Sequence, residues 1–474
     1  FKLNDQNSFW VDAFQSSQTY SNDGDRLGTQ DTPSRARGYK DELEFNREQY
    51  SLGHDGDYSF GKWSTYVSQT ETETKGRTIP TGTFAQNAYA GSDRNLKNTD
   101  LVADTHIIAP IANHILTVGA EYKKAKVADD LAGIGAEFDK DSYSFYAEDE
   151  WRLRENLAFT FGGRYEDHSG FGGQFSPRGY LVWNASDAWT FKGGVSTGYK
   201  APSPKALHDG VIGVSGQGAN FQIGSPDLKP EESLNYELGF NYNNGNLDLT
   251  TTAFFNKIDN LITDGPELLN CSFTTTPNRP GCVSYGSHIT QDTFSQSINA
   301  DEAETKGIEL SLKYQIIPEW DIKAAYTYME SEITKGENKG SYLSNVPKNA
   351  FNMTSTWHIN PAMDVWLQHE YKSERKRYNT EQTSGDAALI YKATGNKLNG
   401  YNLFNLGANY SLSDNVRITG AVNNLLDKDF TKNGSYTDAN GDPASYYDYM
   451  VIGSGMSGTY LPGRNYWLSI SYDF

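Results

Sequence analysis

The sequence predicts an all-β protein, a transmembrane antiparallel β-barrel, and three observations support this prediction. Segments of about ten residues alternate apolar and polar side chains, which is the period of a strand with one apolar and one wet face. Short turns and long polar loops alternate between these segments. The 474 residues include 31 Tyr, 23 Phe and 9 Trp at a mean hydropathy of -0.66. Barrel strands hide half of their side chains in polar patterning, so they lower the average hydropathy in this way.

The alternating segments follow one another along the chain. In one of them, Phe159 and Phe161 alternate with Thr160 and Gly162. The same period recurs at residues 189–196, 236–242, 308–314, 404–412, 416–422 and 466–474. We count about 17 or 18 such segments and find no amphipathic helical pattern between them.

The connections between these segments are of two kinds. The tight ones are LREN, NASDA, NNGN, IIPEW, INPAM and LSDN, and the long polar ones are residues 76–100, 200–231, 264–303, 374–399 and 427–463. Loops longer than about 15 residues are uncommon in compact soluble domains. Outer-membrane barrels have short periplasmic turns at one rim and long extracellular loops at the other, and this chain has the same arrangement.

A soluble β-sandwich or propeller is the alternative fold. Its loops would be short on both sides, and no repeat at a fixed blade period occurs here. Five tryptophans also lie beside the short turns, as in the aromatic girdle of a membrane barrel, namely Trp151, Trp183, Trp189, Trp320 and Trp357. These two features favour the membrane barrel.

The charge of the chain excludes one class of partner. The formal net charge is -19, and the acidic residues are spread along the sequence. Because no basic stripe is present to neutralise phosphates, we expect no nucleic acid as a partner. The first residues, FKLNDQNSFW, contain neither a basic start nor an apolar run, so we expect no signal peptide in them.

The two cysteines, Cys271 and Cys282, lie in the loop sequence NCSFTTTPNRPGCV. In an oxidising compartment they would close a short loop as a disulfide. A metal site would need more ligands, and His288 is the only histidine near them. We assign no metal site and no cofactor, and no catalytic motif is present, so we expect no enzyme.

Several segments resemble one family. GYKAPSPKAL (198–207), GSPDLKPEESLNYELGF (224–240), ADEAETKGIELSL (300–312) and AVNNLLDKDF (421–430) are similar, in this order, to segments of TonB-dependent outer-membrane receptors. The resemblance implies localisation in the bacterial outer membrane and active import energised through the TonB–ExbB–ExbD complex. It also implies a barrel of about 22 strands around an N-terminal plug, which agrees with the size of plugged transporters.

The chain departs from this family pattern at its front. We expect residues 1–474 to form the receptor barrel without its first strands, since the first residues already have a mid-barrel strand pattern. No plug domain and no TonB box are recognised, so contact with TonB is expected through the missing N-terminal region. The last strand resembles the signal by which outer-membrane barrels are recognised for insertion, with Tyr466, Tyr472 and Phe474 on its apolar face.

The front segments are similar to a subgroup, the receptors for enterobactin and colicin I. These segments are residues 17–32, 35–56 and 76–82, and the subgroup carries ferric catecholates, which are flat-faced anions. The residues expected to bind such a ligand are Arg35, Arg37, Arg77, Tyr20 and Tyr39. Guanidinium groups can bond its oxygens and stack on its rings, and tyrosines add aromatic area and a hydroxyl. The alternative is that these arginines are solvated or paired with nearby acids.

Other functions and partners stay open at this point. Because loops choose the ligand, a hydroxamate siderophore, haem or cobalamin is an alternative cargo, and a passive porin-like channel is an alternative class. Iron is expected only as part of the cargo. Outer-membrane lipid and lipopolysaccharide are expected neighbours, and colicins or phage are further candidate partners.

Overall fold

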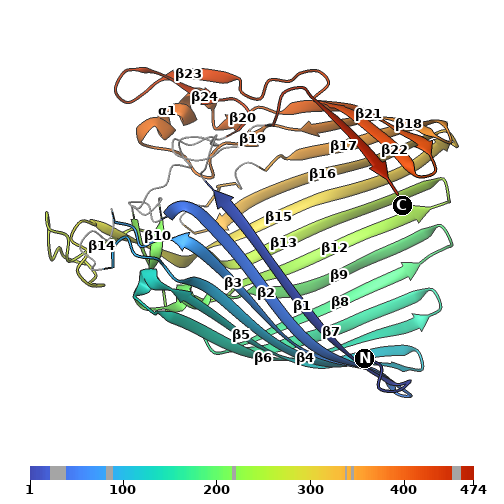
Figure 1. Ribbon diagram of the computed structural model, residues 1–474, viewed down its shortest axis with the longest axis horizontal. Helices are drawn as coiled ribbons and strands as arrows, with labels where there is room; N and C mark the ends of the chain where they lie inside the picture. Colours follow the sequence, from blue (N-terminus) through green and yellow to red (C-terminus); the bar gives the residue numbers. More distant parts are fainter. Residues whose placement is uncertain are drawn as a thin grey trace. The chain divides into compact units, whose positions relative to one another are not determined.

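The computed structural model describes residues 1–21, 39–81, 89–215, 220–336, 339–342, 346–450 and 461–473 (Figure 1). The chain forms two compact units, which are described separately. Unit 1 contains residues 1–180, 196–234 and 258–301, and unit 2 contains residues 181–195, 235–257 and 302–474.

Unit 1 begins with a meander of antiparallel strands, each paired with the next along the chain. The strands are β1 (Asn7–Ser21), β2 (Tyr39–Tyr58), β3 (Gly61–Arg77), β4 (Leu96–Ile111), β5 (His114–Asp129), β6 (Glu137–Arg154) and β7 (Leu157–His168). Five further long strands have residues in both units: β8 (Gly172–Asn184), β9 (Trp189–Lys200), β12 (Glu231–Asn243), β13 (Leu247–Asp264) and β15 (Thr293–Ile317).

Unit 2 continues the antiparallel pairing from the second half of β15. Its strands, in pairing order, are β16 (Trp320–Lys335), β17 (Asn349–Asn360), β18 (Met363–Lys372), β21 (Tyr401–Ser413), β22 (Val416–Asn423) and β25 (Asn465–Tyr472). Within the described residues, eighteen of the 25 strands span eight or more residues. This agrees with the number of alternating segments counted in the sequence.

The register separates two faces of the unit 1 sheet. One ladder row joins Val11, Leu52, Val67, Ala103, Tyr122 and Tyr143 across six strands. The row beside it, one residue along each strand, joins Tyr66, Asp104, Glu121, Ser144 and Glu166. We call the first the apolar face and the second the polar face. In a membrane barrel the apolar face contacts lipid and the polar face lines the interior.

The described turns agree with the predicted ones. Residues 155–156, 185–188, 244–246, 318–319, 361–362 and 414–415 each connect two long strands. Tryptophans lie next to these turns, and the rings of Trp320 and Trp357 stack with their centroids 5.8 Å apart. Among the described residues, no helix is both long enough and apolar enough to cross a membrane.

The long connections contain the small elements (Figure 1). They are η2 (Asp130–Ala132), η3 (Pro204–Leu207), β10 (Val211–Ser215), β11 (Asn220–Ile223), β14 (Leu268–Leu269), β19 (Arg375–Lys376), α1 (Gly385–Thr394), β20 (Lys397–Leu398), β23 (Asn433–Thr437) and β24 (Pro443–Tyr447). The helix α1 was not predicted. It buries none of its side chains, so it lacks the apolar stripe that reveals a helix in a sequence, and Gly395 ends it in the left-handed conformation.

A small apolar core holds the loops of unit 1 together. Its buried members are Ile79, Leu131, Phe221, Ile223 and Phe294. They come from the β3–β4 connection, η2, β11 and the start of β15. These segments are far apart in the sequence, so the core makes one assembly of four separate loop regions.

A buried ion cluster lies at the end of β5 in the same unit. Asp129 is fully buried, and its two carboxylate oxygens accept hydrogen bonds from Arg94 at 2.7 Å and Lys205 at 2.6 Å. The Leu131 N–H donates to the same carboxylate at 3.1 Å and so starts η2. Asp129 therefore ties the β3–β4 connection and η3 to one strand end.

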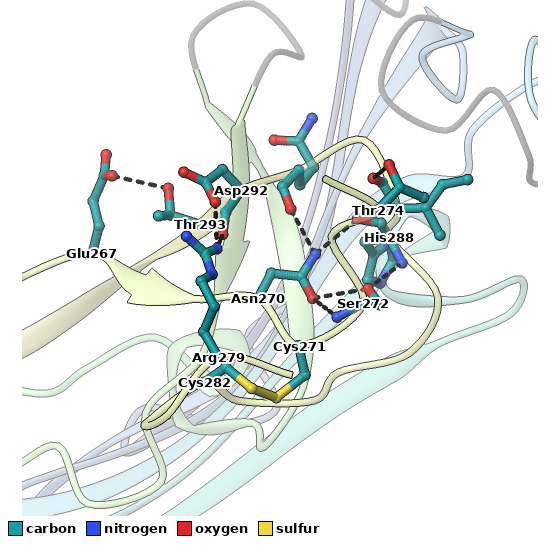
Figure 2. A network of polar contacts seen from close by, with 12 residues as sticks. Glu267, Asn270, Cys271, Ser272, Thr274, Arg279, Cys282, His288, Asp292 and Thr293 are labelled. Atoms are coloured by element: carbon teal, nitrogen blue, oxygen red, sulfur yellow. Dashed lines mark hydrogen bonds and ion pairs between the residues drawn. A yellow bond between two sulfur atoms is a disulfide. The ribbon is translucent and has the colours of Figure 1, made fainter. Parts of the chain in front are cut away.

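The third support of these loops is the segment between β14 and β15 (Figure 2). The structure joins Cys271 to Cys282 with a Cα–Cα distance of 5.1 Å. The neighbouring Asn270 is fully buried, and its amide donates to the carbonyls of His288 at 2.8 Å and Gln291 at 2.7 Å. Its side-chain oxygen accepts from Ser272, and Arg279 forms an ion pair with Asp292. One asparagine and one disulfide thus close this loop on itself.

We predict that Asp129→Asn loosens the loop assembly of unit 1. The substitution removes the fully buried carboxylate from the partly buried Arg94 and Lys205, and breaking a buried pair from one side costs about 3–5 kcal/mol. Hydrogen exchange of residues 89–95 and 200–215 in the purified protein should become faster. The matched control is Asp139→Asn, because Asp139 forms a solvent-exposed pair with Lys124 at 2.9 Å. Equal protection of these loops in the two variants would contradict the assignment.

We also predict that replacing both Cys271 and Cys282 with serine affects only the loop. Opening a ring of this size removes about 3 kcal/mol in the chain-entropy description of disulfides. Exchange should rise in residues 271–282, while the bonds of Asn270 keep residues 288–291 protected. The barrel should retain its heat-modifiable gel mobility, since its strands are held by their own ladders. Loss of that mobility in the variant would show that the disulfide supports the barrel itself.

Candidate functional site

The residues predicted to bind ligand lie where β1, β2 and β3 meet the long connections. Tyr20 is the second-last residue of β1, Tyr39 the first of β2 and Arg77 the last of β3. The backbones of Tyr39 and Arg77 are register partners, so these two positions lie side by side. Arg35 and Arg37 lie outside the described residues, in the connection between β1 and β2.

Tyr20 is available to a ligand. Its side chain is 60% exposed, and its ring meets that of Phe45 edge-to-face with centroids 5.5 Å apart. Phe45 lies on β2, two residues from Leu43, the register partner of Tyr20. The contact holds the phenol in place while its outer surface remains in solvent.

Arg77 belongs to the connected loop region. Its carbonyl accepts a hydrogen bond from the Arg94 N–H at 3.0 Å, and Arg94 is bound to Asp129. The strand end that carries Arg77 is therefore coupled to the buried ion cluster. The structure brings Tyr20, Tyr39 and Arg77 to the same end of three adjacent strands.

Unit 2 contains a separate cavity of about 410 Å³ beside β19, the middle of β15 and the second half of β16. Five cationic and four acidic residues line it: Lys306, Lys348, Arg375, Lys376 and Lys397, with Glu304, Glu330, Glu332 and Glu374. Most of these lysines already have acidic partners, such as Lys397 with Glu374 at 3.1 Å and Lys306 with Glu330 at 3.7 Å. Because its charges nearly balance, this cavity does not concentrate a highly charged anion.

Arg375, which lines this cavity, and the nearby Arg377 are two cationic residues that the sequence reasoning missed. Arg375 and Arg377 donate to the carbonyls of Tyr449 and Tyr447, both at 2.5 Å. Burial lowers the pKa of both guanidinium groups, yet an arginine pKa starts so high that both remain charged. The alternation of Arg375 and Arg377 in the run RKRY was the available signal. Their bonds hold the end of β24 and the segment that follows it, so we assign them a structural role.

The other residues predicted from the sequence are the two cysteines and three aromatic residues near the end of the chain. Cys271 and Cys282 are bonded to each other. Tyr466 and Tyr472 lie on β25, where both are exposed, and Phe474 lies outside the described residues. Among the described residues, no group of three or more His, Cys, Asp or Glu side chains is placed to hold a metal ion.

Three comparisons place the chain among known proteins. An iron-regulated outer membrane virulence protein of Vibrio cholerae serotype O1 is 29% identical over 481 residues, which covers 100% of this chain and 64% of that protein. The ferrienterobactin receptor of Escherichia coli K12 is 25% identical over 492 residues, covering 95% of this chain and 62% of that protein. The crystal structure of a mutant ferric enterobactin receptor of Pseudomonas aeruginosa in complex with enterobactin has a TM-score of 0.76 and 21% identity, covering 100% of this chain and 69% of that one.

These similarities extend over the whole chain but over part of each relative. The chain spans 64% of the length of the Vibrio cholerae protein. The structural likeness supports the fold, with the antiparallel strands and long connections described above. A family model, TonB dependent receptor-like β-barrel, matches residues 2–425. The chain therefore belongs to the TonB-dependent receptor family, and its long strands are β-barrel strands of such a receptor in the bacterial outer membrane.

Proposed function

We propose that this chain is part of a receptor that binds and imports a ferric siderophore, with a ferric catecholate as the ligand. Support comes from the names of its relatives, which include a ferrienterobactin receptor and an iron-regulated outer-membrane protein. Energy would come through the TonB–ExbB–ExbD complex, as the family name implies. No resident cofactor is part of the proposal, because the iron is cargo.

The ligand assignment rests on the residues that lie together at one end of β1, β2 and β3. Tyr20, Tyr39 and Arg77 share this end, and Arg35 and Arg37 belong to the connection between β1 and β2. Arginine is planar and forked, so it bonds oxygen anions and also stacks on aromatic faces. A catecholate complex presents both anionic oxygens and aromatic rings, and these two residue types match both properties.

Two other readings are weaker. A passive porin-like channel does not fit the family to which the chain belongs. Hydroxamate siderophores, haem and cobalamin differ chemically from a ferric catecholate, and nothing in the described residues favours one of them as the ligand. Exposed aromatic side chains on the apolar face support contact with lipid and lipopolysaccharide, and colicins or phage remain candidate partners at the outer loops.

We predict that replacing Arg35, Arg37 and Arg77 together with alanine weakens binding of ferric enterobactin more than tenfold. Each charge-assisted hydrogen bond is typically worth about 1.5–3 kcal/mol, so the loss of three exceeds a factor of ten even without additivity. The measurement is an equilibrium titration of the intact receptor. Affinity should also fall as salt rises, because the attraction at these wet loops is screened.

The controls separate the ligand from the residues. The same titration with a ferric trihydroxamate and with cobalamin tests the ligand class. Tight binding of either one without catecholate binding would contradict the catecholate assignment. Unchanged catecholate affinity in the triple variant would contradict only the three arginines. Heat-modifiable gel mobility confirms that each variant is folded.

A further inference from the structure

The polar face of β1 and β2 has a row of aromatic side chains around one arginine. Phe14 and Tyr20 lie on β1, and Phe45 and Arg47 lie on β2. The register pairs Gln18 with Phe45 and Ser16 with Arg47, so the two strands alternate these side chains along one strip. We call Phe14, Tyr20, Phe45 and Arg47 the aromatic–arginine ladder. Figure 1 shows β1, β2 and β3 running side by side.

The register also determines which face these side chains occupy. Gly53 of β2 pairs with Trp10 and with Tyr66, and Tyr66 begins the polar row that contains Asp104 and Glu121. Phe45 and Arg47 are separated from Gly53 by even numbers of residues, so they share its face. The ladder therefore lies on the face that a membrane barrel turns towards its interior.

The contacts within the ladder leave its surfaces open to solvent. The guanidinium carbon of Arg47 lies 5.9 Å from the centre of the Phe14 ring, and its Nη2 donates to Gln49 at 3.2 Å. Phe45 meets Tyr20 edge-to-face. The side chains of Phe14, Phe45 and Tyr20 are 48%, 37% and 60% exposed. Apolar rings with this much exposure on a water-facing surface have area left for another partner.

Among the described residues, the acidic side chain on the same face of β1 is Asp12, which lies two residues before Phe14 and four before Ser16, the register partner of Arg47. Glu48 follows Arg47 directly and Glu44 precedes it by three residues, but both lie on the opposite face of β2. The register partners on β3 are hydroxyl-bearing: Gln49, Arg47 and Phe45 face Thr70, Thr72 and Thr74. Among the described residues, no ion pair involves Arg47, which is exposed. A positive charge thus stands among aromatic rings and hydroxyl groups with no acid beside it.

We propose that the aromatic–arginine ladder is a subsite for a planar aromatic anion, here one catecholate ring of the ferric complex. This assignment rests on the proposed function. The guanidinium group would bond the ring oxygens, and the exposed faces of Phe14 and Phe45 would pack on the ring. The threonine hydroxyls of β3 supply further donors to the same oxygens. Because Tyr20 belongs to both groups, the ladder continues the proposed outer site along the interior face.

The test is an equilibrium titration of the intact receptor with ferric enterobactin and with a ferric trihydroxamate as a non-aromatic probe. Arg47→Gln should weaken binding of ferric enterobactin at least fivefold. Arg47→Lys should give an intermediate loss, since it keeps the charge but not the planar fork. Phe45→Leu should cost about threefold, in line with the weaker contribution of one aromatic contact. Any residual binding of the trihydroxamate should change less than that of enterobactin in all three variants.

Arg152→Gln is the matched control. Arg152 lies near the short turn at the other end of β6, where it contacts Glu150 at 3.5 Å, so the same substitution there should leave binding unchanged. If wild type binds ferric enterobactin and Arg47→Gln binds it equally well, the subsite is wrong and the proposed function stands. If wild type binds no ferric enterobactin, the proposed function is wrong and the subsite falls with it. Should Arg47→Gln fail to fold by gel mobility, Arg47→Lys and Phe45→Leu decide the question.

Discussion

The requirement that every backbone polar group be paired inside a membrane governs this structure. Hydrocarbon offers no water to an unpaired N–H or C=O, so spanning strands must pair along their full length. β4 and β5 meet this requirement without a break, from Leu96 opposite Asp129 to Ile111 opposite His114. Once the ladders are continuous, side chains can only alternate between two faces. That alternation places charged residues next to exposed aromatic ones in sequence while keeping them on opposite sides of the sheet.

The long connections are outside this constraint and are held in another way. Their apolar residues are few, so each assembly is built around a small core and a buried polar residue with several partners. Asp129 accepts hydrogen bonds from the basic side chains of Arg94 and Lys205. Asn270 donates to two carbonyls and accepts from Ser272. In unit 2, Arg377 donates to the carbonyl of Tyr447, the last residue of β24, and Arg375 donates to that of Tyr449 just beyond it. Burying a polar group without a hydrogen-bond partner destabilises the folded state. The hydrogen bonds of these side chains therefore favour one arrangement of their loops.

Most of the barrel could be predicted from the sequence because period-two patterning and turn length are local signals. The strands and short turns follow from them, but α1 does not, since an exposed helix has no apolar stripe. The residues of the proposed binding end could be reached from the sequence only in part. Resemblance predicts Tyr20, Tyr39 and Arg77, whereas it gives no signal for Arg47, which has Glu48 next to it and Glu44 three residues before it in the sequence. Its separation from them depends on the face it occupies, and only the register reveals that.

The same segregation of faces shows how a protein of net charge -19 could receive the anion proposed as its ligand. Net charge describes the whole surface, but a ligand responds to charges within about 8–10 Å, the screening length at physiological salt. Near the outer end of β2, Glu44 and Glu48 project from the apolar face and Arg47 from the polar face. The strand thus presents acid on one side and a cation with aromatic neighbours on the other. An anion entering along the polar face meets Arg47 without meeting those acids, so the local charge, and not the total, decides what this surface attracts.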